Sequence, residues 1–104
     1  MIVDIRTYNI VPRKMATYLA VFEEYALPVQ QKYLGDPLAY FQTTSGNLNQ
    51  VVHIWGFDSL ADMEQKRAAR DADPAWADYL GRTEGLVVSQ QNSIARPTAW
   101  SGIR

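Results

Sequence analysis

The chain has 104 residues, a single histidine, no cysteine and a formal net charge of −1. This length suits one domain, and the small charge gives no electrostatic reason to expect a nucleic acid or an anionic membrane as a partner. The lack of cysteine excludes disulfides, thiolate metal sites, iron–sulfur clusters and cysteine nucleophiles. Charged residues at positions 4 and 6 interrupt the apolar core of a signal peptide, and no apolar run reaches the length of a membrane span. We therefore expect a single-domain cytoplasmic protein.

The first third of the chain predicts a strand followed by a helix. Residues 2–10 alternate in character and include Ile, Val, Thr and Tyr, which is typical of a strand. Apolar side chains then recur at spacings of three and four, which predicts a helix that ends near Gly35. Pro28 lies inside this pattern and should kink or interrupt the helix. The predicted apolar stripe is Met15, Tyr18, Leu19, Phe22, Ala26 and Val29.

The middle of the chain predicts a β-hairpin. Residues 38–44 read as a second strand, and residues 48–57 read as a third. The residues between them, Ser45-Gly46-Asn47, have turn chemistry because Gly and Asn tolerate positive φ. The two strands should therefore pair antiparallel.

Helix signals follow the hairpin, and a last strand ends the pattern. Asp58 or Ser59 should cap a helix, since Ser59-Leu60-Ala61-Asp62 is a variant capping box. Asp73-Pro74 should interrupt that helix, and a short one should cover residues 75–81. Residues 85–95 supply the last strand.

The predicted element order is β-α-β-β-α-β, which is the ferredoxin-like α+β topology. In that topology four antiparallel strands form one sheet, and both helices pack on one face. The other face should also be apolar, because Val52 and Ile54 point away from Val51, Trp55 and Phe57 in an alternating strand. Exposed apolar patches of this kind are rare on monomers. We therefore expect a homodimer formed through the open sheet face.

Three segments also carry a family resemblance. They are Ile5-Arg6-Thr7-Tyr8 followed by Pro12, the block from Leu48 to Asp62, and Asp73-Pro74-Ala75-Trp76 with Tyr79-Leu80. Together they span most of the chain and resemble the NIPSNAP family. The resemblance implies one NIPSNAP-like domain over residues 1–104, with a dimeric α+β barrel fold, in a bacterial-type single-domain member. It implies no catalytic residues, because none are agreed for the family.

The chain departs from the family pattern at two positions. The first turn reads Pro12-Arg13-Lys14, where Pro-Gly-Lys is expected, so its backbone should differ. Gly56 stands where members often carry a larger polar or basic residue, which should open space near Trp55.

His53 is the candidate catalytic residue. Histidine is the only side chain here with an ordinary pKa near neutrality, which suits acid–base chemistry or axial ligation of haem. The alternative is a structural histidine whose ring nitrogens are satisfied by a neighbouring carboxylate or carbonyl. No other group at a diagnostic spacing forms a triad with His53, and the sequence predicts no metal site and no cofactor.

Four further residues are candidate ligand-binding residues. Arg6 and Tyr8 share one face of the first strand, and a guanidinium beside a phenol suits a carboxylate or an enolate-like ligand. The alternative is that Arg6 pairs with Asp4 and Tyr8 packs in the sheet. Tyr40 and Trp55 lie on adjacent hairpin strands, where they could line a cavity or simply fill the core.

Arg67 and Arg70 lie one helical turn apart and could bind an anion. We interpret them instead as surface residues that balance Asp62, Glu64 and Asp71.

Three functions remain open. The first is a homodimer that binds a small molecule between sheet and helices. The second is a small-molecule enzyme of the dimeric α+β barrel type, a monooxygenase or an isomerase, with His53 as acid–base residue. The third is a non-catalytic protein-interaction module. Nucleotide, metallohydrolase and serine-hydrolase motifs are absent from the sequence.

Overall fold

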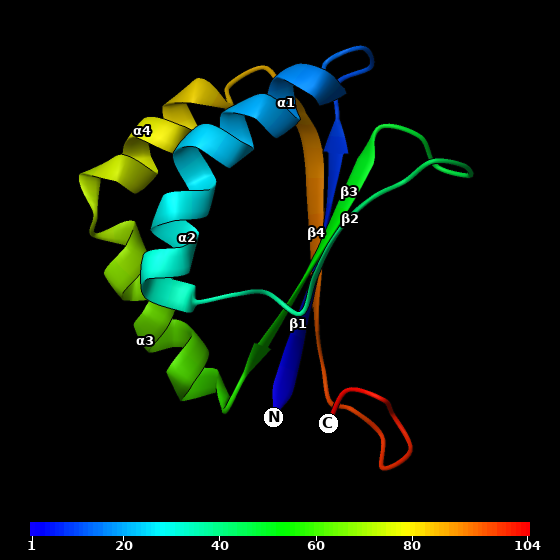
Figure 1. The fold of residues 1–104 in the computed structure, drawn as a ribbon, viewed down its shortest axis with the longest axis vertical. Coiled ribbons are helices and arrows are strands. Elements are labelled where there is room, and N and C mark those ends of the chain that lie inside the picture. Colours follow the sequence, from blue (N-terminus) through cyan, green and yellow to red (C-terminus); the bar gives the residue numbers. More distant parts are fainter.

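The computed structural model describes all residues, 1–104 (Figure 1). Four strands form one antiparallel sheet in the order β2-β3-β1-β4. Their bounds are β1 Ile2–Ile10, β2 Ala39–Gln42, β3 Gln50–Phe57 and β4 Val87–Ala95. Every pair of neighbouring strands is antiparallel, and this strand order confirms the predicted ferredoxin-like α+β fold.

All helices lie on one face of the sheet, and the other face carries none (Figure 1). None of them is long and apolar enough to cross a membrane. Their bounds are α1 Met15–Val21, the π-helical turn η1 Phe22–Ala26, α2 Leu27–Leu34, α3 Leu60–Asp71 and α4 Pro74–Arg82.

The interruption predicted at Pro28 takes the form of a π-helical turn just before it. The Leu27 N–H reaches back to the Phe22 carbonyl, five residues earlier, rather than four. Proline has no N–H to donate and its ring collides with the carbonyl of a regular preceding turn, so a wider turn accommodates it. The helix then continues to Leu34 and ends at Gly35, whose φ of 75° suits glycine.

The predicted helix starts after β3 are confirmed. The Ser59 hydroxyl accepts a hydrogen bond from the Asp62 N–H at 3.1 Å, and the Asp62 carboxylate accepts one from the Asp58 N–H at 3.1 Å. The Asp73 carboxylate accepts a bond from the Ala75 N–H, so α4 begins at Pro74. The break between α3 and α4 therefore lies at Asp73-Pro74, as predicted.

The hairpin has shorter strands and a longer loop than predicted. The Thr43 hydroxyl contacts the carbonyls of Asn47 and Gln50, at 2.6 and 3.2 Å, and Asn49 adopts a positive φ of 62°. These side-chain and backbone preferences hold residues 43–49 in a loop rather than in the ladder.

Both faces of the sheet are apolar near its centre, as predicted. Val51, Trp55 and Phe57 are buried against the helices. On the open face Ile5 is 36% exposed and Phe41, the partner of Val52 in the ladder, is 57% exposed. The open face thus presents apolar side chains that no element of this chain covers.

The two departures from the family pattern have structural consequences. A side chain at Gly56 would stand 3.2 Å from Leu38, so the expected open space near Trp55 is wrong: Leu38 fills the position left by the missing side chain. Arg13 has a φ of 72°, which is the left-handed conformation that glycine favours. The turn therefore has a glycine-like backbone with an arginine in it.

Candidate functional site

Strand register brings the candidate residues onto the face under the helices. Arg6 on β1 lies directly opposite His53 on β3, and His53 in turn lies opposite Tyr40 on β2. Because side chains alternate across a strand, Asp4 and Tyr8 share the face of Arg6, and Trp55 shares the face of His53. Alternation within each strand and the register between the strands together assemble this set.

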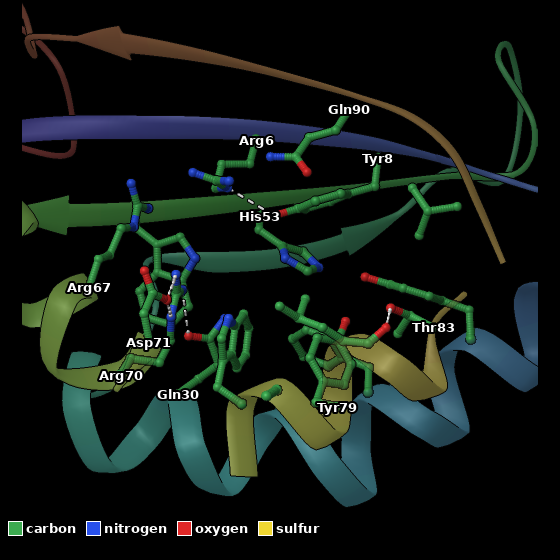
Figure 2. Close-up of a pocket in the computed structure, with 17 residues that line it drawn as sticks. Arg6, Tyr8, Gln30, His53, Arg67, Arg70, Asp71, Tyr79, Thr83 and Gln90 are labelled. Carbon is green, nitrogen blue, oxygen red and sulfur yellow. Dashed lines mark hydrogen bonds and ion pairs between the residues drawn. The ribbon is translucent and has the colours of Figure 1, made fainter. Parts of the chain in front are cut away.

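A cavity of about 510 Å³ lies between this face and the helices (Figure 2). Arg6, Tyr8, His53 and Trp55, four of the five candidate site residues, line it. Its size falls within the range of roughly 300–1,000 Å³ that holds small-molecule ligands. Tyr40 lies beyond the His53 ring and lines a second, smaller hollow instead.

One end of the cavity is rich in arginine. Arg67 and Arg70 of α3 line it together with Arg6, and the three lie on the same side in Figure 2. The side chains of Arg67 and Arg70 are only 15% and 13% exposed, so their interpretation as surface residues is wrong. They lie inward because α3 continues the inward stripe of Met63 at helical spacings of four and seven.

Asp4 anchors two of these arginines. Its carboxylate is fully buried and accepts bonds from Arg6, at 3.1 Å, and from Arg67. Arg6 also donates from Nε to the Tyr8 hydroxyl at 2.8 Å. Burial lowers the pKa of Arg6, but Tyr8 and Asp4 more than offset this, so the guanidinium stays charged. Arg6 is therefore both paired with Asp4 and part of the cavity wall, so the ion-pair and pocket interpretations of Arg6 hold together.

Arg70 is held by different partners. It bonds Asp71 through Nε and one terminal nitrogen, and Gln30 of α2 through the other at 3.2 Å. Its guanidinium carbon lies 4.1 Å from the centre of the Trp76 ring, a close cation–π contact. These contacts fix the position of the charge at the junction of α2, α3 and α4.

His53 lies in an aromatic setting rather than beside a carboxylate. Its ring centre is 4.6 Å from that of Tyr40, 5.0 Å from Phe22 and 5.1 Å from Tyr8. No carboxylate or carbonyl of the chain bonds its ring nitrogens, so the expected structural partner is not there. Burial, and then the charge of Arg6, lower the pKa of His53 to about 4. The imidazole is neutral near pH 7 and keeps its hydrogen-bonding capacity free.

The far end of the cavity is formed by aromatic and aliphatic side chains of the helices and of β4. Tyr79 is buried there, and its pKa is raised to about 12, chiefly by burial. This end is lined by Tyr18, Phe22, Tyr79, Leu80 and Val87, and Trp76 connects it to the arginine end because its ring contacts both Tyr79 and Arg70.

Comparison with known proteins shows the family of this chain. The family model described as NIPSNAP matches residues 3–102. The chain belongs to the NIPSNAP family. A NIPSNAP family protein of unknown function from Agrobacterium tumefaciens is 35% identical, with a TM-score of 0.95 over 100% of this chain and 94% of that one. A second NIPSNAP structure from the same organism is 37% identical, with a TM-score of 0.94 over 99% and 98% of the two chains.

The chain is also similar to part of longer NipSnap proteins. A NipSnap homologue from Dictyostelium discoideum is 24% identical over 90% of this chain and 41% of its own length. The chain thus spans less than half of that relative. A protein from Nitrosomonas europaea assigned as an antibiotic biosynthesis monooxygenase shares the fold alone, at 9% identity and a TM-score of 0.70 over 93% and 98% of the two chains.

The cavity of this NIPSNAP domain is also lined by polar residues that no sequence motif marks. Arg67, Arg70, Gln30 and Gln90 line it, yet none lies beside a recognisable motif. Only the packing of α3 shows that both arginines occupy inward positions, where an apolar residue would otherwise stand. No group of three or more histidine and acidic side chains has the arrangement of a metal site.

The arrangement suits binding of an oxygen-rich molecule. Guanidinium groups and the Tyr8 phenol supply donors at one end, and neutral His53 supplies one donor and one acceptor at the centre. The aromatic end offers an apolar surface. A polar end and an apolar end in one cavity are the ordinary features of a small-molecule site.

Proposed function

We propose that this NIPSNAP domain binds a small molecule in the cavity between sheet and helices. The observation that carries the proposal is the convergence of Arg6, His53 and Tyr8 on a cavity of about 510 Å³. A core built only for stability would be packed to high density and would leave few spaces larger than a water molecule. A cavity of this size with unused hydrogen-bonding groups is the usual form of a ligand site.

A binding screen with a matched pair of variants tests the proposal. Leu80 lines the cavity and is 49% exposed, whereas Leu60 does not line it and is 53% exposed. The screen uses small neutral, anionic and cationic molecules, and ligand-observed NMR detects binding. We expect the compounds that bind the wild type to bind Leu60→Trp equally well. Leu80→Trp should weaken them because the indole narrows the cavity. Binding by no compound, or equal binding by Leu80→Trp, would overturn the proposal.

A second candidate function is catalysis in the same cavity. The observation in its favour is that His53 is neutral, unpaired and directly across the strand ladder from Arg6. A neutral imidazole can accept a proton from a ligand whose oxygens Arg6 and Tyr8 orient. Incubation of each bound compound, followed by mass spectrometry, should show conversion that His53→Gln removes. Identical recovery of every compound with the wild type and the variant would refute catalysis and leave the binding function standing.

The homodimer belongs to the same proposal. Its support is the apolar open face of the sheet, where Ile5, Val52, Ile54 and Phe41 have no covering element. Burial of this face against a second copy would remove apolar area from water, and two-fold pairing makes one patch serve both subunits.

A further inference from the structure

We propose that the end of the cavity formed by Arg6, Arg67 and Arg70 recognises a carboxylate, and that the ligand is a small aromatic monocarboxylate. This inference rests on the proposed small-molecule function and specifies its ligand class. It depends on the charges, the unused donors and the aromatic lining of the cavity.

The charges at this end favour a single negative charge on the ligand. Three guanidinium groups converge there, and only two carboxylates pair with them, those of Asp4 and Asp71. One positive charge therefore remains uncompensated beside neutral His53. A monoanion balances this surplus, whereas a dianionic phosphate would leave a negative charge in a partly buried site.

The donors at this end are not all used. Arg67 makes one hydrogen bond, to Asp4 through one terminal nitrogen, although a guanidinium carries five N–H groups, so its other terminal nitrogen is free. Arg6 uses one terminal nitrogen and Nε, which leaves its other terminal nitrogen free. Unmade hydrogen bonds of partly buried charged groups are costly, and a ligand carboxylate can accept them in a fork-like pair.

The rest of the cavity explains why the ligand body should be aromatic. Trp76 and Tyr79 pack against each other at 4.9 Å between ring centres, and Phe22 meets Tyr79 edge to face at 5.9 Å. All three rings line the cavity, and Figure 2 shows Tyr79 across it from Tyr8 and His53. A flat ring can lie against such walls in the offset or edge-on geometries that aromatic pairs prefer.

Titration calorimetry at pH 7 with benzoate, its neutral counterpart benzamide and dianionic phenyl phosphate tests the inference. Arg70→Gln removes a cavity charge whose partner Asp71 is exposed, and Arg67→Lys keeps the charge beside Asp4 but loses the fork. Arg82→Gln is the matched control, because Arg82 pairs with Asp78 outside the cavity.

We expect the wild type to bind benzoate roughly tenfold or more tightly than benzamide. Arg70→Gln and Arg67→Lys should weaken benzoate by about the same factor and leave benzamide unchanged, and Arg82→Gln should change neither. Equal binding of benzoate and benzamide, tighter binding of phenyl phosphate, or no loss in the cavity variants would overturn the inference. If neither benzoate nor benzamide binds while the wider screen yields other ligands, the aromatic carboxylate fails and small-molecule binding stands.

Discussion

His53 combines burial with a lack of polar partners, which is unusual for a histidine. The side chain is 5% exposed and contacts the rings of Tyr8, Phe22 and Tyr40. A protonated imidazole here would lose its hydration and would stand directly across from the Arg6 charge. The fold therefore selects the neutral form.

This selection predicts a pH dependence of stability. The pKa of His53 is about 4 in the fold and about 6.5 when unfolded, so below pH 6.5 the unfolded chain binds more protons. The contribution of neutral His53 to the free energy of unfolding is fully present above pH 6.5 and is lost as the pH falls towards 4. Between pH 7 and 4.5 the wild type should lose on the order of 2 kcal/mol more than His53→Gln, measured by urea denaturation. An equal loss in both proteins would show that His53 is not held neutral.

The residues of the site differ in how far the sequence predicts them. Arg6, Tyr8, His53 and Trp55 were predictable because strand alternation fixes which side chains share a face. Arg67 and Arg70 were not, because the direction of a helical side chain depends on how the helix rotates against the sheet. Charged residues in an inward stripe look the same in sequence as charged residues on a solvated face.

At the scale of elements, local signals predict the fold well. The Ser59 cap, Pro74 and the alternation of β3 each act over a few residues, and the structure confirms all three. The π-helical turn before Pro28 was not predicted, since its place depends on how the surrounding core holds Phe22 and Ala26. The shorter hairpin strands likewise depend on the Thr43 contacts across the loop.

The turn between β1 and α1 offers a test of backbone strain. Arg13 adopts a φ of 72°, which costs roughly 1 kcal/mol for a residue with a Cβ. Arg13→Gly should therefore raise the free energy of unfolding by up to about 1 kcal/mol, measured by chemical denaturation. Arg13→Ala keeps the Cβ and should give little or no gain. A glycine variant no more stable than the alanine variant would contradict the strain argument.

At the scale of the whole molecule, the two faces of the sheet have different roles. One face is covered by the helices and forms one wall of the cavity. The other face is free of helices (Figure 1). The helix-free face carries Ile5, Val52, Ile54 and Phe41 beside polar residues such as Thr7, and a fully solvated face would not need these apolar side chains. The proposed homodimer gives these side chains an apolar environment.

Light scattering tests the dimer with two matched charge substitutions. Phe41→Glu places a carboxylate on the open sheet face, whereas Leu48→Glu places one in the hairpin loop, where Leu48 is 63% exposed. At micromolar concentration the wild type and Leu48→Glu should have twice the mass of the chain, and Phe41→Glu should move towards the mass of one chain. A wild-type mass equal to one chain would refute the homodimer.

The three tryptophans provide the most direct test of the cavity as a ligand site. Trp55 and Trp76 line the cavity, whereas Trp100 is 83% exposed in the C-terminal segment and serves as an internal control. In ¹H–¹⁵N NMR spectra recorded while a compound from the binding screen is added, the indole N–H signals of Trp55 and Trp76 should shift and saturate together. The Trp100 signal should stay in place. Movement of the Trp100 signal alone, or of no indole signal, would contradict a small-molecule site between sheet and helices.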